Sequence, residues 1–156
     1  MQEIKKKTVQ INIVNRFIVQ AVVGYPLTVY GKGGQTRGYL NIKDTLQCVH
    51  ITEKNPAKSG DLNIYNQIME TFTVNQLAKL TQEAGQESGY DVQIKNIKNP
   101  RVELEEHYYN PSYQGLIKLG VSPNYLTIDT MKHMFRVVDR YKKEIKKNAI
   151  FRGVFW

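Results

Sequence analysis

Two arginines in separate loops are the residues of this sequence best suited to binding chemistry. Arg37 follows a stretch with three glycines in four residues, 31–34, and Arg101 follows Asn99-Pro100. A guanidinium presents a planar fork of donors that matches a phosphate, so two of them from different loops could clamp a diphosphate. For either arginine alone, a surface salt bridge is the competing interpretation.

The stretch from Leu27 to Asp44 surrounds the first arginine. A β-like run, Thr28-Val29-Tyr30, precedes the glycines, Gln35-Thr36 follows them, and a second β-like run covers Tyr39 to Ile42. Glycines allow a backbone to approach a ligand closely, which favours an anion site. The same residues also fit an ordinary β-hairpin whose glycines satisfy the turn geometry. Both interpretations stay open on the local pattern.

A third polar pair, Asn66-Gln67, stands at the end of an alternating segment. From Asp61 to Asn66, Leu62 and Ile64 alternate with polar residues, and this alternation predicts a strand. The two amide side chains that follow can donate and accept hydrogen bonds, so they could contact a sugar or a base.

The rest of the chain alternates between helical and extended patterns. A helix is expected from Val14 to Gly24, with an apolar stripe of Val14, Phe17, Ile18, Ala21 and Val22. A second helix should start at Asn41 or Asp44 and bury Leu46, Cys48 and Val49. A third helix should begin at the capping box Thr73–Gln76 and stop at Gly85 or Gly89. A strand is expected at 91–97 and a short helix at 113–119. The last helix should start at Thr127 and place along one apolar stripe Met131, Met134, Phe135, Val138 and Ile145.

This order predicts an α/β fold with few, short strands, a small lobe and not a complete doubly wound sheet. We see no internal repeat and no linker that separates two domains.

Catalytic signatures are missing from this pattern. The glycines have neither P-loop nor dinucleotide-binding spacing. The three histidines, His50, His107 and His133, lack the spacing of metal ligands, and the lone Cys48 is expected in the core. We therefore expect no catalytic residue and no metal site.

Composition favours a soluble cytoplasmic protein. Hydrophobic residues are 41% and charged residues 23%, and no apolar run approaches the ~20 residues of a membrane span. The net charge is +8, with eight basic and two acidic residues between Lys132 and Arg152. Such a run usually forms a solvated helix face, so we do not expect nucleic-acid binding.

One long stretch points to a family. NRFIVQAVVGYPLTVYGKGGQTRGYLNIKDTLQCV (15–49) resembles the UDP-sulfoquinovose synthase family, which consists of extended short-chain dehydrogenase/reductases of the NAD-dependent sugar epimerase/dehydratase type. The further matching runs are IYNQ (64–67), TVNQLAKL (73–80) and NPRVELEEHYYN (99–110). The resemblance runs from about Val14 to the end. It implies an atypical tail at 1–11 and, at 12–156, the C-terminal UDP-sugar-binding lobe of such an enzyme.

The resemblance also implies roles for single residues. Thr28, Val29 and Tyr30 would border the uracil, with backbone groups reading the base. The diphosphate would be held by Arg37 and Arg101. The other residues expected near the substrate are Gln35, Thr36, Asn66, Gln67, Asn15 and Arg16.

In the family, the glycine-rich NAD motif and the catalytic Tyr-x-x-x-Lys pair belong to an N-terminal half that we do not expect in this sequence. NAD, the family's cofactor, is therefore not expected to bind this chain alone. The chain would be inactive by itself and would need a separate Rossmann-half polypeptide, or it would self-associate through exposed apolar faces. The alternatives are a stand-alone UDP-sugar-binding module and a basic interaction or nucleic-acid-binding domain.

Overall fold

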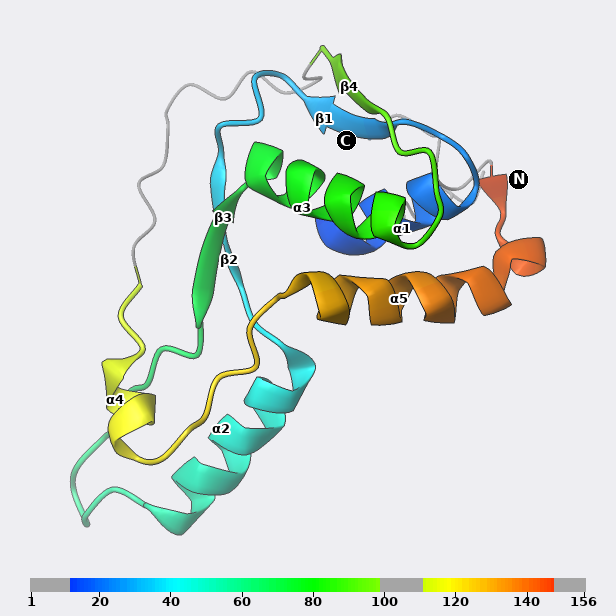
Figure 1. The fold of residues 1–156 in the computed structure, drawn as a ribbon. Coiled ribbons are helices and arrows are strands. Elements are labelled where there is room, and N and C mark those ends of the chain that lie inside the picture. Colours follow the sequence, from blue (N-terminus) through cyan, green and yellow to red (C-terminus); the bar gives the residue numbers. More distant parts are fainter. Residues whose placement is uncertain (1–11, 99–110, 148–156) are drawn as a thin grey trace, which may run out of the picture. The chain divides into compact units, whose positions relative to one another are not determined.

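The computed structural model describes residues 12–98 and 111–147, which form two compact units (Figure 1). Unit 1 holds the described residues up to Gly33, those from Asn75 to 98 and those from Ile128 to 147. Unit 2 holds Gly34–Val74 and 111–127. The architecture is mixed α/β with short strands, as predicted.

Unit 1 combines three helices with a two-stranded parallel sheet. Its elements are α1 (Ile13–Val22), β1 (Leu27–Tyr30), α3 (Val74–Glu87), β4 (Ile94–Ile97), α5 (Ile128–Arg140) and the 3-10 helix η1 (Lys142–Glu144). In Figure 1, α3 runs between the β1–β4 pair and α5. The strands pair with Leu27 opposite Ile94 and Tyr30 opposite Ile97.

Helix α1 follows the predicted apolar stripe. The Asn12 side chain caps its start by accepting a hydrogen bond from the Val14 amide, at 3.0 Å. Phe17 and Ile18 are fully buried, and Gly24, with a φ of 73°, follows the helix as predicted.

A glycine inside α3 sets how closely the helices of unit 1 pack. A Cβ on Gly85 would lie 2.6 Å from Val92 and 3.0 Å from Phe135 of α5. Gly85 therefore allows close packing and does not end the helix. The chain leaves α3 at Gly89, whose φ is 84°.

Unit 2 combines β2 (Thr36–Tyr39), α2 (Ile42–Lys54), β3 (Glu70–Thr73) and α4 (Gln114–Lys118). β2 pairs antiparallel with β3, whereas β1 pairs with β4 in unit 1. The hairpin interpretation of the glycine stretch is therefore wrong, because the two strands that flank the glycines have different partners.

The core of unit 2 forms around the single cysteine. Cys48 packs with Met69, Leu116 and Val121, and the thiol is fully buried. Burial, reinforced by the nearby Asp44 carboxylate, raises the pKa of this thiol. The prediction of a core cysteine is confirmed.

This thiol provides a test of unit 2. We expect Cys48 to react with a thiol reagent far more slowly in the folded chain than in denaturant, because reaction requires unit 2 to open and the raised pKa lowers the thiolate fraction. Timed alkylation followed by mass spectrometry measures this. Equal rates with and without denaturant would contradict the described packing.

Several sequence predictions are wrong in detail. The second β-like run, expected from Tyr39 to Ile42, lies earlier in the chain, since β2 ends at Tyr39 and α2 begins at Ile42. Asp61–Asn66 forms no strand, and Leu62 and Ile64 are 82% and 84% exposed, since that segment finds no pairing partner among the described residues. The start of helix α2 is one of the two predicted starts: the helix begins after Asn41, whose side chain accepts from the Lys43 amide, and it buries Cys48 and Asp44.

Two apolar side chains expected inside α2, Leu46 and Val49, are instead 65% and 58% exposed, because the helix turns its Asp44–Cys48 face to the core. In unit 1, Ile145 does not continue the α5 stripe, because α5 ends at Arg140 and η1 intervenes.

Candidate functional site

The predicted binding residues fall into two groups, one in each unit. Unit 1 holds Asn15, Arg16, Thr28, Val29 and Tyr30, all on α1 and β1. Unit 2 holds Gln35, Thr36, Arg37, Asn66 and Gln67. Arg101 lies outside the described residues, so the clamp formed by two arginines stays a prediction.

Arg16 links α1 to β1. Its Nη2 donates to the Thr28 carbonyl oxygen at 2.8 Å, and its guanidinium carbon lies 4.9 Å from the centre of the Tyr30 ring and 5.5 Å from that of Phe17. Its Nε is buried and has no hydrogen-bond partner among the described residues. Burial lowers the pKa of the guanidinium, and the Tyr30 phenol opposes this shift. The neighbouring Asn15 is exposed on the same helix.

A residue that the sequence analysis missed lies one turn further along α1. Gln20 is 1% exposed, its Nε2 donates to the Thr28 Oγ1 at 2.8 Å, and its Oε1 accepts from the Thr28 amide at 3.1 Å. The available signal was a polar residue four positions after Arg16, within an otherwise apolar stripe.

Alternate residues of β1 direct their main-chain N–H and C=O groups to opposite edges of the strand. The amides of Leu27 and Gly31 donate to the carbonyl oxygens of Gln93 and Ile97 at 2.8 Å, so residues 27, 29 and 31 face β4. Thr28 and Tyr30 direct their main-chain groups to the opposite edge. There Thr28 is bonded to α1, and the Tyr30 amide and carbonyl at the same edge have no hydrogen-bond partner among the described residues.

The side chains of Thr28 and Val29 cannot contact a ligand directly in this arrangement. Thr28 is 8% exposed and Val29 is fully buried. Any base recognition by β1 must therefore use the main chain, as the resemblance implies, or the half-buried Tyr30 side chain.

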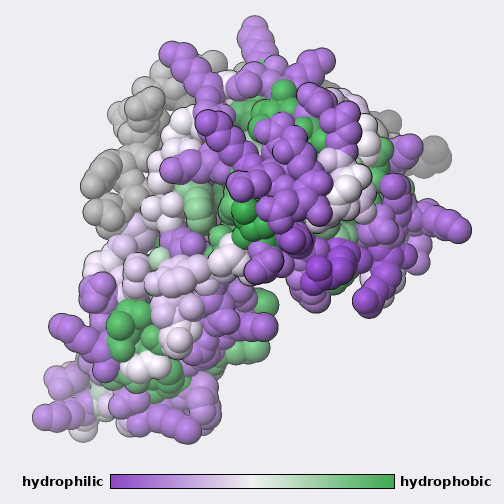
Figure 2. Space-filling view, viewed as in Figure 1, coloured by the Kyte–Doolittle hydropathy of each residue, from purple (hydrophilic) through white to green (hydrophobic). Residues whose placement is uncertain are grey.

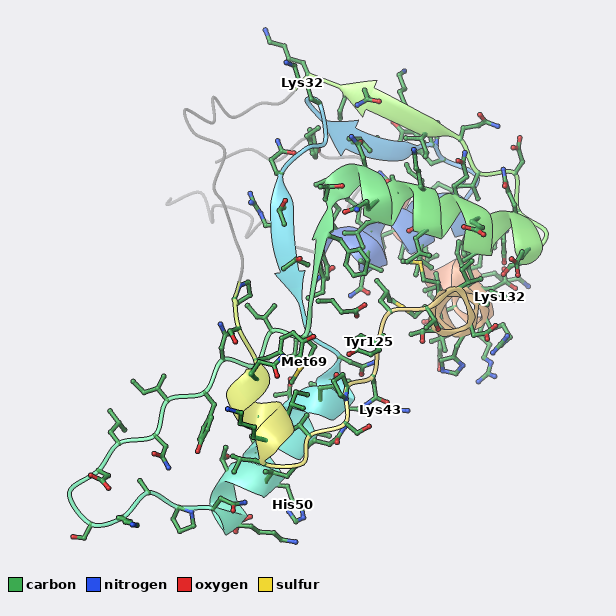
Figure 3. The ribbon with its side chains drawn as sticks, turned by 60° about the vertical axis from the view of Figure 1, so that its left-hand side comes forward. Lys32, Lys43, His50, Met69, Tyr125 and Lys132 are labelled. Atoms are coloured by element: carbon green, nitrogen blue, oxygen red, sulfur yellow. The ribbon has the colours of Figure 1, made fainter. Side chains whose placement is uncertain are left out.

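The glycine turn between the strands is held by two asparagines. Asn75 Nδ2 donates to the Lys32 carbonyl and Asn96 Nδ2 to the Gly31 carbonyl, at 2.8 and 2.9 Å. The Gly33 carbonyl accepts from the Asn75 amide at 3.0 Å. Figure 3 shows the Lys32 side chain projecting from this turn. These hydrogen bonds to the carbonyls of residues 31–33 hold the turn in one shape inside unit 1.

Arg37 stands on β2 as an exposed residue. Its Nη1 donates to the Thr36 carbonyl at 3.0 Å, and Phe72 lies opposite it on β3. Tyr39, two residues on, packs edge-on against Phe72 at a centroid distance of 5.8 Å. Burial raises the pKa of Tyr39 to about 12 despite the opposing charge of Arg37.

Tyr39 also bears on the expectation of a missing Tyr-x-x-x-Lys pair. Tyr39 and Lys43 do have this spacing, so the expectation that the sequence contains no Tyr-x-x-x-Lys pattern is wrong. Tyr39 ends β2 and Lys43 belongs to α2, so the two residues do not share a helix. The raised pKa disfavours the tyrosinate form that a general base of this kind requires.

The amide pair lies in the extended segment of unit 2. Asn66 is exposed and its Oδ1 accepts from the Ile68 amide at 3.3 Å, while Gln67 is half-buried. The turn formed by Asn66 presents the pair together, but not at the end of a strand.

Within residues 12–98 and 111–147, no group of side chains has the composition and geometry of a metal site. No helix in these ranges combines the length and apolarity needed to cross a membrane.

Comparisons with known proteins agree with the resemblance seen in the sequence. No protein-family model matches the chain. The chain is 46% identical over 142 residues to the chloroplastic UDP-sulfoquinovose synthase of Spinacia oleracea, and 42% identical over 146 residues to UDP-sulfoquinovose synthase of Sulfolobus acidocaldarius. These alignments cover 91% and 92% of the chain but only 30% and 37% of the relatives. This partial coverage is consistent with a C-terminal portion of such an enzyme.

Solved structures confirm the fold. The UDP-glucuronic acid 4-epimerase of Bacillus cereus, in complex with UDP-glucuronic acid and NAD, superimposes with a TM-score of 0.63 at 18% identity, over 83% of this chain and 40% of the epimerase. The UDP-glucose 4-epimerase of Thermus thermophilus, in complex with NAD, gives 0.60 at 20% identity, over 81% and 39%. The chain thus has the fold of one part of extended short-chain dehydrogenase/reductases.

Proposed function

We propose that this chain is the UDP-sugar-binding portion of a UDP-sulfoquinovose synthase-like enzyme, which converts UDP-glucose and sulfite to UDP-sulfoquinovose. The observation that carries the proposal is the identity of 46% and 42% to two such synthases over nine-tenths of the chain. The alternative of a basic nucleic-acid-binding domain is not favoured by these relatives.

The geometry of unit 1 supports a base subsite at the outer edge of β1. Uracil presents a ring N–H beside a carbonyl oxygen, and the outward amide and carbonyl of Tyr30 are complementary to that pair. Asn15 and Arg16 stand on the helix beside this strand and would border the nucleotide.

The family resemblance implies that Arg37 contacts the diphosphate. Arg37 is exposed on a paired strand, and a guanidinium matches the oxygens of a phosphate through its planar fork of donors. Gln35 and Thr36 precede it, and Arg101 would provide the second cation. The amides of Asn66 and Gln67 would contact the nucleotide sugar.

NAD supplies hydride transfer in this type of enzyme. The described residues do not fit it, because the glycine turn at 31–34 leads from β1 into β2 and not to a helix N-terminus, and because it lacks dinucleotide-binding spacing. We therefore assign NAD binding and catalysis to a portion of the enzyme other than these residues.

Arg37→Ala should weaken UDP-glucose binding roughly tenfold or more, because a charge-assisted hydrogen bond contributes about 1.5–3 kcal/mol. Arg101→Ala should act in the same direction. The matched control is Arg136→Ala, an exposed arginine of α5, which should leave affinity unchanged. Titration calorimetry measures the UDP-glucose affinity of the unmodified chain and of the three variants. Equal affinity of the Arg37 and Arg136 variants would remove Arg37 from the site.

An exposed apolar stripe on α2 is the surface we assign to the rest of the enzyme. Ile42, Leu46 and Val49 occur at positions i, i+4 and i+7 and are 70%, 65% and 58% exposed. Figure 2 shows hydrophobic (green) surface among hydrophilic (purple) residues over this unit. The relatives are about three times longer than the matched region, so a larger polypeptide is available to cover the stripe.

In the isolated chain this stripe should promote self-association. Leu46→Lys should lower the concentration dependence of sedimentation without lowering the melting temperature, because the side chain contributes little to the core of unit 2. A sedimentation coefficient that is concentration-independent in the unmodified chain would contradict this.

A further inference from the structure

We propose that Gln20 is a positioning residue for base recognition, which fixes β1 so that the main chain of Tyr30 faces the base. This inference rests on the proposed function. Gln20 is too deeply buried to touch a ligand, with 1% of its surface exposed, so any effect on binding must act through β1.

Both polar atoms of the Gln20 amide group are hydrogen-bonded to one residue, Thr28. Its Nε2 donates to the Thr28 Oγ1 at 2.8 Å and its Oε1 accepts from the Thr28 amide at 3.1 Å. A primary amide is the smallest side-chain group that can donate and accept in this paired fashion. It thereby binds both the main chain and the side chain of Thr28.

The third polar group of Thr28 is bonded to the same helix. Arg16 Nη2 donates to the Thr28 carbonyl at 2.8 Å, so two residues one turn apart on α1 bind the amide, hydroxyl and carbonyl of Thr28. The opposite edge of β1 pairs with β4. The strand is therefore held from both edges at Thr28, two residues before the outward groups of Tyr30.

Stability alone does not explain this arrangement. Net contributions of buried hydrogen bonds are small, and replacing buried polar partners by well-packed apolar groups is often nearly neutral. The surrounding positions of α1, Phe17, Ile18 and Ala21, are apolar and buried. A specific polar pairing at Gln20 instead fixes one register and one orientation of β1, which an apolar contact would not do.

The test compares Gln20→Met, which keeps the length and removes both hydrogen bonds, with Thr81→Val as matched control. Thr81 is fully buried in the same unit and donates to the Leu77 carbonyl at 2.7 Å, so its loss also removes a buried hydrogen bond, away from β1. Affinity for UDP and for CDP is measured by calorimetry, and the order parameter of the Tyr30 amide by NMR relaxation without ligand. Melting temperatures establish that each variant is folded.

We expect the unmodified chain to prefer UDP, because cytosine offers an acceptor where uracil offers its ring N–H. Gln20→Met should lower the preference for UDP over CDP on the order of tenfold and lower the Tyr30 order parameter. Thr81→Val should change neither. Gln20→Glu, which retains an acceptor for the Thr28 amide, should keep more of the preference than Gln20→Met, and it serves if the methionine variant does not fold.

The outcomes separate the two claims. An unchanged UDP/CDP ratio and an unchanged Tyr30 order parameter in a folded Gln20 variant would overturn the positioning role while leaving UDP binding intact. Absence of UDP binding by the unmodified chain would overturn the proposed function, and the Tyr30 order parameter would still decide whether Gln20 orients β1.

Discussion

Asp44→Ala is expected to lower the free energy of unfolding of unit 2 by about 3 kcal/mol or more, since each buried polar group left without a partner costs about 1–3 kcal/mol. Asp44 is fully buried. Its carboxylate accepts from the Asn124 amide, at 3.1 and 2.9 Å to the two oxygens, from Asn124 Nδ2 at 2.6 Å and from Gln47 Nε2 at 3.1 Å. Alanine would leave all these donors without the carboxylate.

Asp44→Ala should also weaken the hydrogen bond that a second carboxylate, that of Glu70, makes to the same segment. The Leu126 amide donates to the Glu70 carboxylate at 2.8 Å. The segment 124–126 is therefore bonded to two acidic residues of unit 2, Asp44 on α2 and Glu70 on β3. Burial, with a contribution from Asp44, raises the pKa of Glu70. A raised carboxyl pKa favours the folded state at low pH, and this contribution is lost as the pH rises through the folded pKa.

Urea unfolding followed through Cys48 alkylation measures the effect in unit 2. Asp61→Ala, an exposed acid of the same unit, is the control and should change stability by about 0.5 kcal/mol at most. Asp44→Asn should fall between the two, because it keeps one acceptor oxygen. A loss no larger than that of the control would refute the anchoring role of Asp44.

Gly33→Ala should destabilise unit 1 by about 2–5 kcal/mol, the sum of a left-handed backbone penalty and overpacking. The φ of Gly33 is 70°, and a Cβ there would clash with the Asn75 side chain and lie 2.7 Å from Val29. Because Asn75 also bonds the Lys32 carbonyl, its displacement would loosen the turn as well.

The neighbouring glycine offers a matched control. Gly34 has an ordinary φ, and a Cβ there would meet nothing within 4 Å. Gly34→Ala should therefore be neutral or slightly stabilising, because it restricts the unfolded chain. Thermal unfolding of the two variants distinguishes them, and similar melting temperatures would contradict the described turn.

The helices were the most predictable part of this fold. The stripe Val14–Val22, the exits at Gly24, Gly89 and Gly120, and the buried Met131 and Phe135 all follow from local spacing, because a helix satisfies its own backbone. Strand partners were not predictable in this way. β1 pairs with a strand more than sixty residues away, while the nearby β2 pairs with β3, and no local pattern encodes that choice.

The binding roles of the candidate site residues stay predictions, and the structure adds only where their side chains lie. Arg37 is exposed on β2, whereas Thr28 and Val29 are buried and can act only through the main chain. Gln20 was missed because a glutamine on a helix is ordinarily exposed, and only the fold shows both of its amide atoms on Thr28.

The most direct test of the proposed function is a chimaera of the spinach relative in which this chain replaces the region it matches. Product formation from UDP-glucose and sulfite, followed by mass spectrometry, is the measurement. We predict UDP-sulfoquinovose from the chimaera and a large loss of product on adding Arg37→Ala. A folded chimaera that binds NAD but forms no UDP-sulfoquinovose would contradict the assignment of this chain as the substrate-binding portion of such an enzyme.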